Sequence, residues 1–243
     1  MIYLRIDKML ANLGYGSRKE VKQLLKDGSV KVNDTIIKNA KVHIDPKKDI
    51  VSLKDEVIEY KEFIYLMMNK PQGVISATED AHDKTVVDLL EFEDMVYSPF
   101  PVGRLDKDTE GLLLITNDGQ LAHQLLSPKK HVPKTYFAVI DREVTEEDIQ
   151  AFRQGVTLDD GYLTKPGELK IINSGENSEI ELTITEGKFH QVKRMFEAVG
   201  KRVVYLKRIS MGPLKLDESL ELGEYRELTE EELIQLKNDH KKE

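Results

Sequence analysis

The sequence predicts an α+β protein of two domains, a small helical-plus-hairpin domain followed by a larger domain around a mixed or antiparallel sheet. Two observations lead to this prediction. Two helix patterns and a hairpin pattern open the chain, and several short strand patterns follow, with helices interspersed irregularly rather than in strict alternation. The expected bounds are 1–60 for the small domain and 61–237 for the larger one, with a charged tail at 238–243.

The small domain is predicted from local signals. A helix is expected from Arg5 to Leu13, and the capping box Ser17-Arg18-Lys19-Glu20 opens a second helix. Alternation in Val30-Lys31-Val32 and a turn at Asn33-Asp34 then predict a short hairpin, whose second strand runs from Ile36 through Val42.

The larger domain begins with a strand pattern at residues 63–68. A turn is expected in Asn69-Lys70-Pro71-Gln72-Gly73, followed by a further strand at Val74-Ile75-Ser76. The apolar run Leu112-Leu113-Leu114-Ile115 is short enough for a buried strand, and a terminal helix is expected at residues 228–236.

The composition limits the class of protein. With 243 residues, 40% of them hydrophobic and 33% charged, the chain is expected to be soluble and globular. No apolar stretch approaches the roughly 20 residues that span a bilayer, and Arg5 precedes any hydrophobic region, so the expected compartment is the cytoplasm and no membrane partner is expected. The absence of cysteine excludes disulfides and thiolate metal sites, and the six histidines lack the close pairing of a zinc site.

The net charge of −8 is unevenly distributed along the chain. Residues 1–43 contain nine Lys and Arg against four Asp and Glu, and residues 186–215 contain eight against two, whereas residues 217–243 contain ten acids and four bases. Two basic segments and an acidic tail suit a protein that contacts a polyanion on one side. Ordinary solvent-exposed surfaces without a nucleic-acid partner would show the same distribution of charged residues.

A loop rich in charge and glycine, Gly103-Arg104-Leu105-Asp106-Lys107-Asp108-Thr109-Glu110-Gly111, precedes the buried strand. It holds the carboxylate of Asp106 beside a rigid element, where a reactive group is best positioned. Asp106 could instead cap a turn or pair with Arg104, and the spacing of acids in the loop partly fits the start of a calcium loop. The calcium loop is disfavoured because its twelfth position is Asn117 instead of a bidentate glutamate.

This loop and the strand after it closely resemble the signature of pseudouridine synthases, in the branch that carries Gly-Arg-Leu-Asp. The resemblance implies that Asp106 is the catalytic residue and that Arg104 fills or props the gap left by an extruded nucleotide. It also implies the α+β catalytic fold of that family and a reaction that needs no cofactor and no metal. The family's Asn-Lys-Pro-x-Gly motif is matched at residues 69–73, and it is mainly architectural.

Two further motifs carry the resemblance. Lys134-Thr135-Tyr136 matches the family's Lys-x-Tyr motif, whose tyrosine stacks on the target base, although an isolated Tyr136 would read as a half-buried strand aromatic. His190-Gln191-Val192-Lys193-Arg194-Met195 resembles the last motif, in which the residue at the Lys193 position pairs with the catalytic aspartate. Many relatives have arginine there, and lysine is a point charge instead of a bidentate fork. An adjacent cation is expected to keep Asp106 ionised by lowering its pKa, as a nucleophile requires.

The segment around Lys193 is expected to be a core-facing helix, since its apolar residues share one helical face and Gly200 is a plausible stop. These residues are Phe189, Val192, Phe196 and Val199. His190 is not assigned as a general base, because the resemblance gives it no proton transfer.

The small domain resembles the RNA-binding module of ribosomal protein S-four, through Arg5-Ile6-Asp7-Lys8 at its start and Gly28-Ser29-Val30-Lys31-Val32-Asn33 in the hairpin. Three lysines of the second helix recur at spacings of three and four, so one face could follow a phosphate backbone. The residues expected to bind RNA are Arg5, Lys8, Arg18, Lys19, Lys22 and Lys26.

Together the motifs predict an RNA pseudouridine synthase, a monomer whose partner is ribosomal RNA or an assembling ribosomal subunit. Their spelling looks most like the small-subunit type, synthase A, with the large-subunit synthases B, E and F as close alternatives. A non-catalytic RNA-binding or assembly factor fits less well, because it has no need of a carboxylate facing a polyanion. A carboxylate-using hydrolase normally calls for a second carboxylate in a complementary role, and Asp108 is too close in sequence to be an obvious one.

Overall fold

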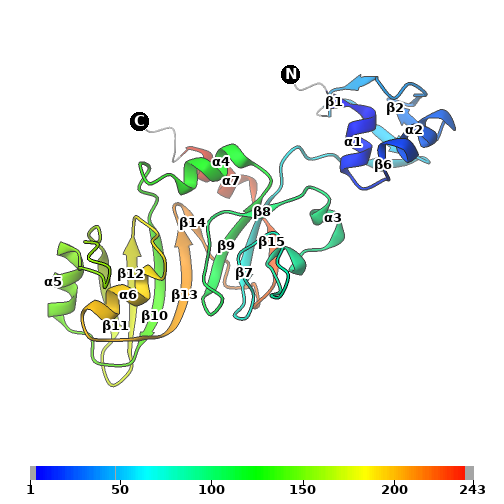
Figure 1. Ribbon diagram of the computed structural model, residues 1–243. Coiled ribbons are helices and arrows are strands. Elements are labelled where there is room, and N and C mark those ends of the chain that lie inside the picture. Colours follow the sequence, from blue (N-terminus) through cyan, green and yellow to red (C-terminus); the bar gives the residue numbers. More distant parts are fainter. Residues whose placement is uncertain (1–3, 47, 239–243) are drawn as a thin grey trace. The chain divides into compact units, whose positions relative to one another are not determined.

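The computed structural model describes residues 4–46 and 48–238, which form two compact units (Figure 1). The first unit contains the chain through Ile64 together with the later segment Leu90–Pro99, and the second contains Tyr65–Leu89 and the chain from Phe100 onward. The prediction of a single boundary near residue 60 did not include the returning segment. The predicted tail at 238–243 lies outside the described residues, apart from Asn238.

The first unit combines three helices with two small sheets around its own apolar core. The helices are α1 (Ile6–Asn12), α2 (Arg18–Lys26) and α3 (Phe92–Met95). A two-stranded sheet pairs β1 (Leu4–Arg5) with β4 (His43–Ile44). A four-stranded antiparallel sheet has the order β3-β2-β5-β6, formed by β2 (Val30–Val32), β3 (Thr35–Ile36), β5 (Val51–Leu53) and β6 (Glu56–Ile58).

Most local predictions for this unit are confirmed. The capping box is present, because the backbone N–H of Ser17 donates to Glu20 Oε2 at 2.7 Å and that of Glu20 donates to Ser17 Oγ at 3.4 Å. The hairpin of β2 and β3 is also present, but its second strand is shorter than predicted, and His43 pairs with Arg5 in a separate sheet instead. The first helix therefore begins at Ile6, one residue later than expected.

The second unit is built on a mixed sheet, as predicted, and this sheet has nine strands. Its main order is β11-β12-β10-β13-β9-β7-β15, with β14 beside β13 and β8 beside β9. The strands are β7 (Tyr65–Lys70), β8 (Phe100–Pro101), β9 (Glu110–Thr116), β10 (Lys134–Ile140), β11 (Glu168–Asn173), β12 (Ser178–Ile184), β13 (Val203–Met211), β14 (Leu214–Lys215) and β15 (Tyr225–Glu227). Strands β9 and β13 pair in parallel, and the other described pairs are antiparallel.

Helical segments accompany this sheet, and four of them pack in two pairs. The segments are η1 (Val87–Leu89), α4 (Gly119–Leu126), α5 (Glu146–Gln154), α6 (Gln191–Ala198) and α7 (Glu230–Asn238). Leu121 of α4 and Leu236 of α7 belong to one core cluster with Leu114 of β9. Helices α5 and α6 pack against each other through Phe152 and Phe196, whose ring centroids are 4.9 Å apart.

Three sequence predictions for the second unit need correction. Strand β7 continues through Lys70, so that the expected turn is present but confined to Gln72 and Gly73. No strand forms at 74–76, where Ile75 makes only an isolated bridge. Helix α6 starts at Gln191, because His190 adopts a left-handed backbone conformation with φ of 48°. Phe189 therefore lies outside the helix and is 74% exposed instead of facing the core.

None of the helices in the described part of the chain is both long enough and apolar enough to cross a membrane.

Candidate active site

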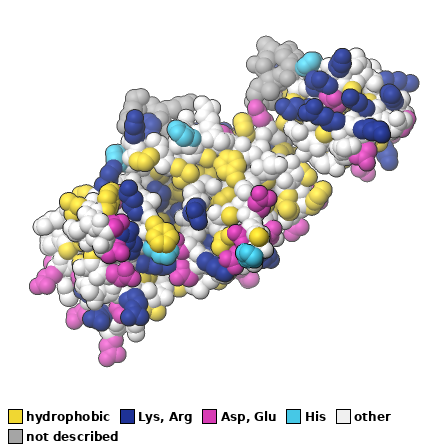
Figure 2. Space-filling model, in the orientation of Figure 1, with side chains coloured by type: hydrophobic (Ala, Val, Ile, Leu, Met, Phe, Trp, Pro, Cys, Tyr) yellow, Lys and Arg dark blue, Asp and Glu magenta, His cyan; other side chains and the backbone are white. Residues whose placement is uncertain are grey.

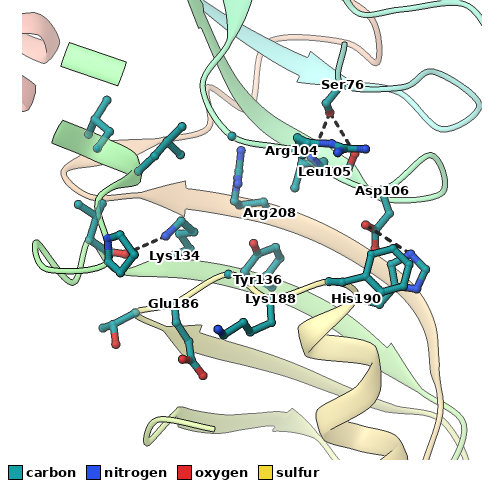
Figure 3. A pocket seen from close by; sticks show the side chains of 18 of the residues that line it. Ser76, Arg104, Leu105, Asp106, Lys134, Tyr136, Glu186, Lys188, His190 and Arg208 are labelled. Carbon is teal, nitrogen blue, oxygen red and sulfur yellow. Dashed lines mark hydrogen bonds and ion pairs between the residues drawn. The ribbon is translucent and has the colours of Figure 1, made fainter. Parts of the chain in front are cut away.

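A pocket of about 730 Å³ opens in the second unit, and three of the residues predicted from sequence line it (Figure 3). Asp106 and Arg104 come from the loop before β9, and Tyr136 comes from β10. Lys193 contacts Asp106 from α6. The structure thus brings together residues from three segments that are far apart in sequence.

The loop that carries Asp106 is tied down by a buried lysine. The ammonium of Lys70, which is 0% exposed, donates to the carbonyl oxygens of Asp106 at 3.1 Å, Thr109 at 2.9 Å and Pro71 at 2.9 Å. Burial lowers the pKa of Lys70 to about 8, while the negative charges of Asp106 and its neighbours oppose that change. Lys70 therefore holds the loop backbone at Asp106 and Thr109 and ties it to Pro71.

A second set of bonds fixes the residues directly before and after Asp106. Ser76 Oγ donates to the carbonyl of Leu105 and accepts from its N–H, both at 3.0 Å. The N–H of Gly73 donates to the carbonyl of Lys107 at 2.8 Å. The segment expected to form a strand at 74–76 thus positions the Asp106 loop instead.

Asp106 has a cationic neighbour. Lys193 Nζ lies 3.3 Å from Asp106 Oδ2 and 2.6 Å from Asp108 Oδ1. Burial tends to lower the pKa of Lys193, but the hydrogen bond to Asp108 and the charge of Asp106 outweigh it, so the pKa lies above its usual value. For Asp108, burial is likewise outweighed by Lys193, and its pKa is lowered.

His190 lies on the other side of the same carboxylate. Its Nε2 is 3.7 Å from Asp106 Oδ1, too long for a good hydrogen bond (Figure 3). The Asp106 side chain remains 29% exposed, so it is accessible from the pocket.

Tyr136 lies opposite Arg208 on the neighbouring strand β13, and both line the pocket. Arg208 is 2% exposed, and its Nε donates to the carbonyl of Leu112 at 2.8 Å. Its Nη2 is buried and has no hydrogen-bond partner among the described residues. Lys134, two residues before Tyr136, also lines the pocket, and burial together with the charge of Arg208 lowers its pKa to about 8. An aromatic ring beside two cations suits a ligand that combines a planar base with anionic groups.

Glu186 is the other carboxylate that lines this pocket, and it is already engaged. It accepts hydrogen bonds from the Tyr162 hydroxyl at 2.7 Å, the Lys165 N–H at 3.0 Å and Gln191 Nε2 at 2.6 Å. A hydrolase that needs two cooperating carboxylates is therefore poorly supported by the geometry. Within residues 4–46 and 48–238, no group of three or more His, Asp or Glu is placed to hold a metal ion.

The residues predicted to bind RNA lie in the first unit. Figure 2 shows Lys and Arg side chains gathered on one face of it. Arg5 is partly committed, because its Nε and Nη2 donate to Asp7 at 3.0 and 2.7 Å. The side chains of the other five predicted residues are exposed, namely Lys8, Arg18, Lys19, Lys22 and Lys26.

Sequence reasoning missed three residues of the site. Lys70 was assigned to a turn, Arg208 was counted only as one charge of a basic segment, and Lys134 only as part of a motif. The two-residue spacing of Lys134 and Tyr136 in β10 could have placed both side chains on the same face of the sheet. Arg208 lies on that face because it pairs with Tyr136 across β10 and β13, and this pairing cannot be predicted from either strand alone.

Two family models match the chain. Residues 64–198 match RNA pseudouridylate synthase, and residues 4–51 match the S4 domain.

Similar proteins share nearly the whole length of this chain. An RNA pseudouridine synthase of Bacillus subtilis named YtzG, described as uncharacterized, is 60% identical over 95% of this chain and 97% of its own length. The ribosomal small subunit pseudouridine synthase A of Salmonella typhimurium is 40% identical over 95% of this chain and 98% of its own length. A solved pseudouridylate synthase is 38% identical and superposes with a TM-score of 0.67, covering 96% of this chain and 99% of the other.

Proposed function

The chain belongs to the RNA pseudouridylate synthase family, and from this premise we propose that it converts one specific uridine of small-subunit ribosomal RNA to pseudouridine. The enzyme class follows from the family. The choice of small-subunit RNA is supported by relatives named ribosomal small subunit pseudouridine synthase A, which align with at least 95% of the chain. The S4 domain supports a structured RNA as the partner.

The single observation that carries the proposed chemistry is the accessible carboxylate of Asp106 beside the Lys193 ammonium in an aromatic-lined pocket. The reaction breaks the bond between ribose C1′ and uracil N1, turns the base, and joins C1′ to C5. The proton of C5 is released, and N1 gains one, so the product has the composition of the substrate. Asp106 acts as the nucleophile that forms a temporary bond to the sugar or the base while the base is detached.

The uridine must leave its stack to reach Asp106, which takes a few kcal/mol. Stacking on Tyr136 offsets this loss, and Arg104, exposed at the pocket edge, fills the gap in the RNA. Lys193 pairs with Asp106 and orients its carboxylate. The lysines of α2 contact phosphates elsewhere on the RNA, and the protein acts as a monomer in the cytoplasm without a metal ion or cofactor.

Replacing Asp106 with asparagine tests the catalytic role. We expect isomerisation to fall by at least about 10³-fold, because the amide keeps the shape but is a far weaker nucleophile. The dissociation constant for RNA should change by less than about threefold. Tritium release from RNA labelled at C5 of uridine measures turnover. Glu176→Gln, which neutralises an exposed carboxylate in the turn between β11 and β12, is the matched control, and an active Asp106→Asn enzyme would rule out the proposal.

The substrate is tested by mapping pseudouridines in ribosomal RNA from cells with and without the protein. Loss of one site in the small subunit is the expected result. Loss of a site only in the large subunit would leave the enzyme class intact and reject the small-subunit assignment.

A further inference from the structure

Phe189 is the most exposed of the large apolar side chains in the described part of the chain, at 74%. One face of its ring stacks on the imidazole of His190, with centroids 3.7 Å apart and ring planes at 20°. Such exposure contributes little to folding, since apolar side chains stabilise a fold when they leave water. The ring is therefore available to a ligand.

The backbone around Phe189 is held firmly. Gln191, which is 4% exposed, donates from Nε2 to Glu186 at 2.6 Å and accepts from the Lys188 N–H at 2.8 Å. The carbonyl of Phe189 accepts from Arg194 Nη1 at 3.4 Å. His190 keeps a left-handed conformation with φ of 48°, which non-glycine residues adopt at a free-energy cost of about 1 kcal/mol. The fold thus maintains an exposed aromatic ring in one place.

That place adjoins the catalytic carboxylate. Phe189 and His190 both line the pocket of Asp106 and Tyr136, and the imidazole against which Phe189 stacks lies 3.7 Å from Asp106. Tyr136 is assigned to the target base, and Phe189 lines the same pocket. Cationic side chains line the same pocket, namely Arg104, Lys107, Lys134, Lys165, Lys188 and Arg208.

We propose that Phe189 is a stacking platform for an unpaired nucleobase next to the target uridine, an inference that rests on the proposed function. An aromatic face surrounded by cations fits a base attached to a phosphate backbone, because the ring takes the base and the cations take the phosphates. Stacking accepts any base, so Phe189 contributes affinity and fixes the strand while tolerating different neighbours of the target.

The chain contains no tryptophan, so Phe189→Trp introduces a single fluorescent reporter at this position. Titration with an unstructured oligoribonucleotide should lower its fluorescence by roughly twofold or more, because stacked bases quench indole. Ile172→Trp, at a position of β11 that is 49% exposed in the same unit and does not line the pocket, is the matched control and should respond little. An abasic oligomer with the same phosphates should not quench.

Saturation is checked separately by the anisotropy of a labelled oligoribonucleotide. Unchanged fluorescence of Phe189→Trp at saturation, equal quenching of Ile172→Trp, or quenching by the abasic oligomer would each overturn the platform. If Phe189 contacts a protein partner instead of RNA, the fluorescence of Phe189→Trp should stay unchanged when the oligoribonucleotide is saturating.

Kinetics provide the second test. Phe189→Ala should raise KM for RNA about 5- to 100-fold and change kcat by less than about threefold, whereas Phe189→Tyr should restore KM. An unchanged KM in Phe189→Ala would overturn the platform while leaving the proposed function intact. Base-dependent quenching of Phe189→Trp in a protein that modifies no RNA would support the platform and reject the proposed function.

Discussion

At the scale of single residues, two buried or half-buried lysines serve opposite ends of the site. Lys70 binds three backbone carbonyls and holds the Asp106 loop. Lys134 has Arg208 as its charged neighbour and faces the pocket. The first stabilises the fold. The second donates to the carbonyl of Val132 at 3.2 Å and carries a charge that burial and Arg208 disfavour.

Replacing Lys70 with methionine should affect both stability and turnover. Loss of the donor leaves three carbonyls unpaired, so we expect the free energy of unfolding to fall by about 2–3 kcal/mol. Since Asp106 loses its support, kcat should fall more than about tenfold. Urea unfolding and tritium release measure the two effects. Lys215→Met, at an exposed position in β14, is the control, and wild-type values for Lys70→Met would contradict the anchoring role.

Lys134 predicts a dependence of stability on pH. Its pKa is about 8 in the folded protein and about 10.5 in the unfolded chain, so below pH 8 both states carry the proton and burial of the charge weakens the fold. As the pH rises from 8 toward 10.5, the folded state releases the proton first and this weakening disappears. At pH 7, Lys134→Met should therefore melt about 2–5 °C above wild type, and the difference should shrink by pH 9.5.

The control for this titration is Lys134→Arg, whose side chain stays protonated throughout the range. Its difference in melting temperature from wild type should widen at high pH, where wild type loses the charge. A gap between Lys134→Met and wild type that is the same at pH 7 and pH 9.5 would contradict the assignment.

At the scale of elements, the sheet of the second unit depends on a short parallel contact. Strands β9 and β13 pair at Glu110 with Lys207 and at Gly111 with Arg208. Gly111 has a φ of 102°, and a Cβ there would lie 2.2 Å from the Arg208 carbonyl oxygen. Glycine at the end of the Asp106 loop therefore lets the loop enter β9 directly against β13, where Arg208 and Tyr136 line the pocket.

Gly111→Ala should consequently destabilise the protein by about 3 kcal/mol or more, because both the backbone conformation and the strand contact are lost. Gly175→Ala, with open space around the new methyl group, should change stability by less than about 1 kcal/mol. Urea unfolding of both variants measures the difference. Equal stability of the two would show that β13 shifts easily and that the contact is not required.

At the scale of the whole molecule, acidic composition and RNA binding coexist because charge is segregated. The net charge is −8, yet helix α2 presents exposed lysines at positions 19, 22 and 26, and the pocket is lined by further cations. Electrostatic attraction falls off within about 10 Å at ordinary salt, so local clusters matter more to a bound RNA than the net charge.

Salt dependence measures these contacts. Replacing Lys19, Lys22 and Lys26 together with glutamine should reduce the slope of log K against log salt by about 2, because each phosphate contact contributes about 0.7–0.9. The control replaces three other exposed lysines of the first unit, Lys38, Lys41 and Lys54, and should leave the slope nearly unchanged. Equal slopes in the two triple variants would show that the lysines of α2 do not contact RNA phosphates.

Local chemistry alone determined much of this protein. The capping box at Ser17 and Glu20 started α2 as predicted, and the apolar run after Gly111 formed a buried strand, because caps and short hydrophobic patterns act within a few residues. The motif around Asp106 led to the pocket and, through resemblance, to the family.

Tertiary structure decided what depends on partners distant in sequence. The extension of β7 through Lys70 was unpredictable because Asn69 and Lys70 pair with Leu112 and Gly111 of β9, which are distant in sequence. The carbonyls that bind the Lys70 ammonium are likewise distant in sequence. Phe189 was expected in the core, but the conformation of His190 and its contacts leave the ring exposed beside Asp106. Burial, charge pairing and strand register are set by contacts between segments, so the sequence alone indicates which groups are available and the fold decides which of them meet.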